Sequence, residues 1–397
     1  MEKDLEDTLY LMGCALNSIK ADPERLKQMN FEKIYHISSR HMISSIVVTS
    51  LIDSGIYDAL PMSSDLSKKW IWQREQTIRR TMLMDHERNK LFSFMESAGI
   101  GYMPLKGIIL KDLYPQIGMR QMADNDILFD EKRKDDLKKY MDEAGYTCKD
   151  NPGSNHLVFS KAPFYSFEMH KLLVNEKLFH RWSSYNSEAP KHLIKNDGDR
   201  YGYHFSDEDF YIFMIIHSYK HYSVSGTGLR TLADWYIYLC QKKSMNWNYI
   251  NNEMEKYGVS DFERTGRTLS EKIFSADGIN AGIDFSALSA SESDMLIYVY
   301  GSGTYGTIQN RCRNDLKALF SEEETSQKNK IKIRYYWNRI VPPLSWYEAN
   351  APYVYQHRYL VPFYVIGRLV RAVIFKRSRI KVEINTLNKE LKEKQNQ

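Results

Sequence analysis

Two aspartates separated by one residue, Asp124 and Asp126, precede an apolar run at residues 127–129. If residues 122–129 form a strand, both carboxylates point to the same side, because side chains two positions apart share a face. Carboxylates held this close repel each other unless a cation lies between them, and their oxygens suit a hard metal such as Mg²⁺ or Mn²⁺. Since such metals commonly bind phosphates, the pair predicts nucleotide chemistry.

A third carboxylate follows in a second alternating segment. Glu168 and His170 alternate with Phe167 and Met169, so an extended chain would place the two polar side chains on one face. If this strand pairs with the strand of Asp126, three carboxylates could hold two divalent ions about 4 Å apart, with Glu168 as a ligand and a base. His170 could orient Glu168 or touch the substrate, or be a half-buried histidine bonded to the backbone.

Basic residues lie upstream of the aspartates. Lys106 and Gly107 stand at a predicted turn from a strand at residues 102–105 to a helix at residues 108–114. Backbone N–H groups at such a turn favour an anion, and Lys106 adds a charge for a phosphate. Arg120, four residues before Asp124, could neutralise charge on a leaving pyrophosphate. These residues predict a nucleotide-binding edge beside the metal ligands.

A later helix carries further polar residues. His217 and His221 are four residues apart and share a helix face, a spacing that can bind zinc, but no third ligand matches them. We therefore favour a polar face beside the cleft, from which they and Lys220 could contact substrate. Lys220 and Arg230 could bind phosphate or simply be solvated. Asp234 could pair with Arg230 at helical spacing.

The chain divides into four expected regions. Residues 1–94 show helical apolar spacing, and residues 95–175 form a small mixed β-sheet core with strands at 102–105, 122–129, 156–160 and 165–170. Residues 176–330 are helical again and include a glycine-rich loop at 300–307, interpreted as flexible and as a lid. Residues 331–397 are a basic aromatic segment. The expected fold class is α+β, a small mixed sheet flanked by N-terminal and C-terminal helical regions.

Composition narrows the class of protein. The net charge of +5 among 397 residues gives no specific nucleic-acid signal. Four dispersed cysteines without C-x-x-C spacing favour a reducing cytoplasm over a disulfide framework. The acidic N-terminus lacks the apolar core of a signal peptide. A cytoplasmic location is therefore expected.

The C-terminal segment allows two interpretations. Its apolar run at residues 359–375 is interrupted by a proline and two arginines, so it is a poor membrane span. Basic residues beside large apolar ones could lie on an anionic membrane as an interfacial helix, giving peripheral membrane contact. The alternative, which we favour from the pattern, is a helix that docks on the body of the protein.

Taken together, these motifs resemble those of the uncharacterised nucleotidyltransferase family within the DNA polymerase β-like superfamily. The resemblance rests on the Leu-Lys-Gly turn at 105–107, Arg120 with Asp124 and Asp126, and Glu168 with His170, and it covers most of residues 95–240. It implies metal-dependent transfer of a nucleotidyl group from an NTP to an unknown acceptor, with the three carboxylates as ligands. Two departures are the Lys-Gly turn, where the superfamily has Gly-Gly or Gly-Ser, and Asn125 in a usually apolar position.

Two alternatives remain. An Asp-x-Asp pair also binds the diphosphate of nucleotide sugars, as in glycosyltransferases, but that fold needs an alternating strand–helix half before the motif. The chain could also be a non-catalytic nucleotide-binding or membrane-surface scaffold. Intact carboxylates argue against the scaffold.

Overall fold

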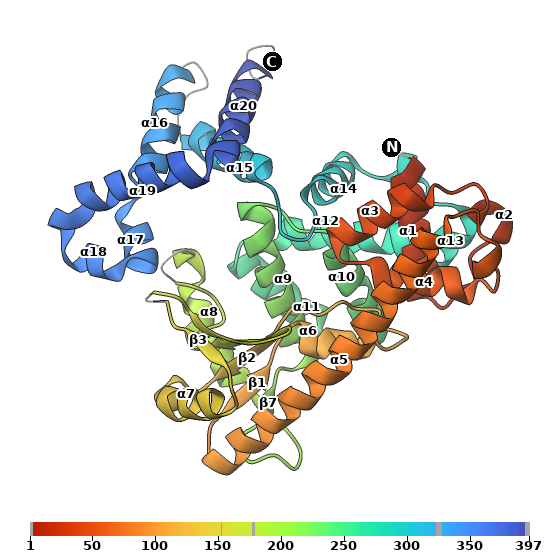
Figure 1. Ribbon diagram of the computed structural model, residues 1–397, viewed down its shortest axis with the longest axis horizontal. Helices are drawn as coiled ribbons and strands as arrows, with labels where there is room; N and C mark the ends of the chain where they lie inside the picture. Colours follow the sequence, from red (N-terminus) through yellow and green to blue (C-terminus); the bar gives the residue numbers. More distant parts are fainter. Residues whose placement is uncertain (1–2, 152, 177–178, 323–327, 394–397) are drawn as a thin grey trace.

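The protein consists of helices packed around one small mixed sheet (Figure 1). The computed structural model describes residues 3–151, 153–176, 179–322 and 328–393. The N-terminal helices are α1 (Lys3–Leu16), α2 (Pro23–Leu26), α3 (Phe31–His41), α4 (Ser44–Asp53) and α5 (Ser64–Ala98). No strand occurs between residues 3 and 98, as predicted. The α+β fold class with helical flanks is confirmed.

Five strands form the sheet in the order β1-β2-β5-β4-β3. They are β1 (Tyr102–Pro104), β2 (Asn125–Phe129), β3 (Thr147–Lys149), β4 (His156–Lys161) and β5 (Tyr165–His170). β2 and β5 run parallel, and the other pairs are antiparallel. The alternating apolar residues Ile127 and Phe129 of β2 and Phe167 and Met169 of β5 are buried against α5 and α7 (Lys134–Glu143). The opposite, polar face of these strands is left for the site.

Three local predictions differ from the structure. β2 begins at Asn125 rather than at 122, so Asp124 precedes the strand. The helix expected at 108–114 is α6 (Gly107–Leu110) followed by a 3₁₀ turn, Lys111–Leu113. Strand β3 and the hairpin of β6 (Ile194–Lys195) and β7 (Tyr203–His204) were not predicted. These strands are only two or three residues long, too short for a recognisable alternation.

The central helices supply the other wall of the site. They are α8 (Ser183–Glu188), α9 (Asp207–Val224), α10 (Leu229–Gln241), α11 (Trp247–Lys256), α12 (Ser260–Phe274), α13 (Ala276–Ala281) and α14 (Ala290–Ser302). α9 starts at the expected cap, where the Ser206 hydroxyl accepts the N–H of Asp209. Its buried residues join those of α1, α4, α10 and α12 in the largest apolar core. This core fixes α9 and α10 opposite β2 and β5.

The C-terminal helices project away from this body (Figure 1). They are α15 (Ile308–Glu322), α16 (Lys328–Ile340), α17 (Leu344–Asn350), α18 (Pro352–Gln356), α19 (Val361–Phe375) and α20 (Arg377–Glu393). A separate small core, which includes Cys312, Tyr335 and Leu387, joins α15, α16 and α20. Only Val365 of α19 is buried, so the favoured interpretation of this segment as a docked helix is wrong. Among the described residues, no helix has the length and apolarity needed to cross a bilayer.

Candidate active site

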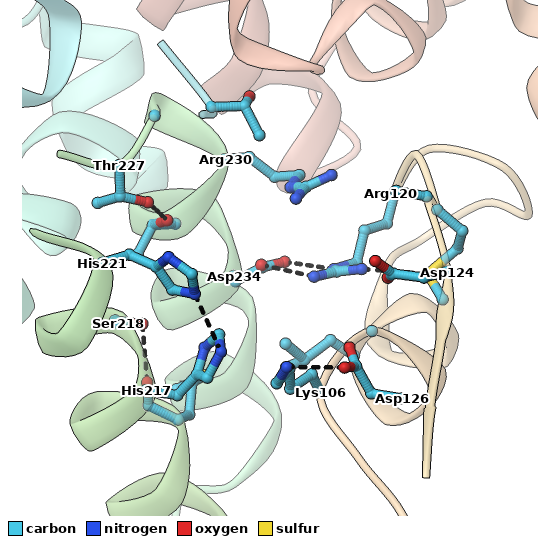
Figure 2. A pocket seen from close by; sticks show the side chains of 18 of the residues that line it. Lys106, Arg120, Asp124, Asp126, His217, Ser218, His221, Thr227, Arg230 and Asp234 are labelled. Atoms are coloured by element: carbon cyan, nitrogen blue, oxygen red, sulfur yellow. Dashed lines mark hydrogen bonds and ion pairs between the residues drawn. The ribbon is translucent and has the colours of Figure 1, made fainter. Parts of the chain in front are cut away.

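A pocket of about 410 Å³ with both polar and apolar lining residues lies between the sheet and helices α9 and α10. Its lining includes all three predicted carboxylates, Asp124, Asp126 and Glu168. Figure 2 shows His217 and His221 on one side of the pocket and Lys106 with two of the carboxylates on the other. Most of the residues singled out from three distant segments of the sequence therefore meet in one cavity, whereas His170 and Lys220 are not part of its lining.

Strand register brings two of the carboxylates side by side. Asp126 of β2 is the direct partner of Glu168 of β5 in the parallel pair. Ligand atoms of Asp126, Glu168 and His170 all lie within 4.8 Å of one another, a spacing that could hold a metal ion. Asp124 lines the same pocket but is outside this cluster, because it precedes β2. The structure thus groups His170, rather than Asp124, with the other two.

Asp126 is the best-satisfied carboxylate of the site. The Lys106 ammonium and His170 Nε2 each lie 2.8 Å from the same oxygen, Oδ1. Burial alone would raise the pKa of Asp126, but Lys106 and His170 outweigh it and hold that pKa well below its usual range. Asp126 is therefore ionised, and because burial lowers the pKa of His170 to about 4, a neutral His170 donates its Nε2 proton to it.

Glu168 has the opposite electrostatic environment. Burial, and then the charges of Asp126 and Asp124, raise its pKa to about 7. Burial and Asp126 likewise raise the pKa of Asp124. The ionised forms of Glu168 and Asp124 are therefore disfavoured beside the ionised Asp126. A divalent cation among the three carboxylates would offset this repulsion.

Lys106 reaches Asp126 from an unusual backbone conformation. It has φ 43° and ψ −113°, a region that costs a residue with a side chain about 1–3 kcal/mol. The turn is tied to β2, since the Leu105 N–H donates to the Asp126 carbonyl oxygen at 2.9 Å. A Cβ atom on the next residue, Gly107, would lie 2.6 Å from Arg120 Nη1, so a larger residue there would force the Arg120 or Met122 side chain to move. The Lys-Gly turn is thus held by a backbone hydrogen bond to β2 and packs closely against the Arg120 side chain.

Arg120 is held by a carboxylate of α10. Its Nε and Nη2 donate to the two oxygens of Asp234 at 2.7 and 2.9 Å, and the Tyr114 hydroxyl donates to the same group. The predicted pairing of Asp234 with Arg230 is therefore wrong. Arg230 donates to the Gln121 carbonyl oxygen and has no carboxylate partner among the described residues. Because Arg230 lines the pocket and is partly buried, it is not an ordinary solvated side chain.

The polar face of α9 lies across from the carboxylates. His217 and His221 contact each other through their Nε2 atoms at 3.1 Å, and neither belongs to the metal-type cluster found among the described residues. Burial, and then the charge of Lys106, lower the pKa of Lys220 to about 8. The expected polar helix face beside the cleft is present, whereas nothing in the described part of the chain adds a third zinc ligand to the histidine pair.

The glycine-rich segment also reaches the pocket. Its first residues, 300–302, belong to α14, and Thr304 and Tyr305 line the cavity. The loop is fastened by two backbone bonds, from the Thr304 N–H to the Arg40 carbonyl and from the Thr307 N–H to the Ser225 carbonyl. Sequence reasoning suggested a lid but did not connect these two residues to the carboxylates, because no local pattern encodes a contact across that separation.

Asn125, one of the two departures noted above, is explained by α5. Its side chain is buried, and its Oδ1 accepts a hydrogen bond from Arg88 Nη1 at 3.1 Å. A polar residue in this position therefore ties the start of β2 to α5.

A parallel strand pair places two carboxylates side by side in a pocket that is also lined by Lys106 and Arg230. This arrangement is suited to phosphate chemistry. Comparison with known families agrees with this class. The family described as uncharacterised nucleotidyltransferase matches residues 27–275, and the chain belongs to that family. No curated protein and no solved structure shows a significant match to the chain.

Proposed function

We propose that the protein is a metal-dependent nucleotidyltransferase that moves a nucleoside monophosphate from an NTP to a hydroxyl or phosphate acceptor. The observation that carries the proposal is the pairing of Asp126 with Glu168 in adjacent parallel strands, inside a pocket lined by basic side chains. Family membership supports the transferase class.

The donor set fits Mg²⁺ or Mn²⁺. Asp126 and Glu168 offer oxygen ligands, and Asp124 lines the same pocket as a third. His170 fits a positioning role better than a ligand role, because its Nδ1 is buried without a hydrogen-bond partner in the described residues. A metal-bound histidine almost always donates its second N–H to another group. A cation held by these carboxylates would neutralise triphosphate charge and polarise the phosphorus that is attacked.

The other side chains would serve the phosphates and the proton. Lys106 and Arg230 are the cations placed to bind the triphosphate, while Arg120 is already held by Asp234 and would position the adjoining wall. Glu168 lines the pocket and would take the proton of an acceptor hydroxyl as the oxygen attacks the α-phosphorus and pyrophosphate leaves. His217, Lys220 and His221 would face the acceptor or the nucleotide.

The N-terminal helices and the cysteines bear on the glycosyltransferase alternative and on the cellular location. A nucleotide-sugar glycosyltransferase would need strands before the Asp-x-Asp pair, whereas residues 3–98 contain only helices and turns. The four cysteines are unpaired, which supports the proposed cytoplasmic location.

The test uses purified protein, NTPs labelled separately at the α and γ phosphates, and added cell extract as acceptor source, with Mg²⁺ or Mn²⁺. We expect metal-dependent transfer of the α label, abolished in Asp126→Asn and retained in Asp142→Asn, an exposed α7 aspartate that serves as a matched control. Transfer of the γ label alone would contradict the proposal. Nucleotide binding without transfer, across many acceptors, would favour the scaffold.

A further inference from the structure

The C-terminal helices expose an apolar surface that the rest of the chain does not cover. We propose that α19 is an interfacial helix that docks the protein on an anionic lipid surface. One face of α19 is exposed, the segment around it is basic, and its other side contacts a neighbouring C-terminal helix.

The exposed face of α19 is apolar along its length. Phe363, Ile366, Val370 and Val373 are spaced three or four residues apart, so they lie on one side of the helix. Their side chains are exposed, with fractions of 71% for Phe363 and 58% for Ile366. Ile374 is also exposed and extends the same surface, and Leu369 is exposed at its edge. Continuous apolar patches of this kind mark binding sites rather than ordinary surface.

The charge around this face is of one sign. Residues 349–382 contain no aspartate or glutamate and seven basic residues. Five of these are exposed at or just beyond the second half of α19: Arg371, Lys376, Arg377, Arg379 and Lys381. Long basic side chains can keep their charges at the headgroups while the apolar face enters about 5–10 Å into the interface. An apolar face followed by five exposed cations complements an anionic membrane.

A shallow groove between α19 and α20 repeats the same combination. It is lined by Val373, Ile380 and Ile384 together with Arg377 and Lys381. Apolar side chains beneath two cations suit the upper part of an acyl chain and its phosphate. The groove thus continues the chemistry of the exposed face onto the next helix.

The inner side of α19 packs on other C-terminal helices and, among the described residues, not on the body of the protein. Val365 is buried, and the Arg368 guanidinium lies 4.4 Å from the centre of the Trp346 ring of α17. α20 is in turn tied to α15 by an ion pair between Arg313 and Glu390. The contacts on the inner side hold α19 in place as a formed helix. Membrane binding therefore does not have to offset the entropy lost in ordering this segment.

The test is flotation of the full chain with vesicles of phosphatidylcholine alone or with about 30% phosphatidylglycerol. We expect at least about tenfold more protein with the anionic vesicles, and loss of this binding at high salt. Ile366→Asp should abolish flotation, since it puts a charge into the apolar face. Ile297→Asp is the matched control, because Ile297 of α14 is exposed to a similar fraction, 61%, and should bind as the wild type.

Three results would overturn the proposal. One is equal recovery with neutral and anionic vesicles, and another is normal flotation of Ile366→Asp. The third is a vesicle-free dimer that Ile366→Asp dissociates, which would assign the face to a second copy of the chain. Circular dichroism checks that both variants are folded. We expect both to fold, because Ile366 and Ile297 are exposed.

Discussion

Asp126 and Glu168 face each other across two parallel strands, yet the surroundings drive their pKa values in opposite directions. Lys106 and His170 keep Asp126 ionised, whereas Glu168 experiences burial and the negative charge of its neighbours. A pair of titratable groups with separated pKa values is a common feature of acid–base sites. The predictions that follow test the groups that create this difference.

Glu168→Gln should remove transfer activity without harming the fold. Loss of a ligand and a base should lower kcat by about 100-fold or more, while the melting temperature stays unchanged or rises because a repelled carboxylate has gone. Single-turnover kinetics and calorimetry measure both quantities. Glu131→Gln is the control, since this exposed residue lies beyond the other end of β2. Retained activity in Glu168→Gln would remove Glu168 from the reaction.

Lys106→Gly and Lys106→Met separate backbone strain from charge. Both lose the ammonium next to Asp126, but only glycine relaxes the φ of 43°. Lys106→Gly should therefore have a free energy of unfolding about 1 kcal/mol above that of Lys106→Met in urea titrations. The same two changes at Lys139, an exposed residue within α7, should give the opposite order. Equal stabilities at position 106 would mean that the turn is unstrained.

Asp234→Ala should be severely destabilising. It leaves the buried Arg120 guanidinium without its counter-ion, a loss of about 3–5 kcal/mol. The double variant Arg120→Met/Asp234→Leu should recover part of this loss, because no unpaired charge remains. Asp261→Ala is the comparison, since it breaks an exposed pair with Arg264 and should cost under about 1 kcal/mol. Similar values for the two aspartates in chemical denaturation would contradict the buried pairing.

Gly107→Ala should disturb the turn through a collision. The added methyl group would lie 2.6 Å from Arg120 Nη1 and 2.8 Å from the Met122 sulfur. We expect a loss of about 1–3 kcal/mol in stability, together with weaker nucleotide binding in a fluorescence titration. Gly301→Ala, in α14, meets nothing within 4 Å and should be neutral or slightly stabilising. A Gly107→Ala variant as stable as the wild type would show that the wall moves aside easily.

The stability of the protein should fall with acid through His41. This buried residue accepts the Leu229 N–H at 3.1 Å, and burial followed by the charge of Arg40 lowers its pKa to about 3. The unfolded chain binds a proton near pH 6.5, so stability is complete above that pH and is lost as the pH falls toward 3. At pH 5 the loss is about 2 kcal/mol. His41→Asn keeps an acceptor without titrating and should flatten this part of the pH profile of unfolding.

Local pattern predicted the elements that carry the site. The alternation in residues 156–160 and 165–170 gave strands within one residue of β4 and β5, and the cap at Ser206 marked the start of α9. The start of β2 could not be read in this way. Its pairing ends at Asn125, because β1 reaches only Pro104 and β5 pairs no earlier residue. Strand ends depend on partners, which the period of one segment does not contain.

The sequence alone determined which chemistry is available: three carboxylates, a Lys-Gly turn and basic helix residues, in the order of a nucleotidyltransferase. Tertiary structure decided which of them act on one another. Glu168 and His170 lie beside Asp126, whereas Asp124 precedes the strand. Arg120 pairs with Asp234, and Arg230 lines the pocket without a carboxylate partner among the described residues. Residue types and local periods are properties of short segments, whereas ion pairs between distant segments are fixed only when packing brings helices and strands together.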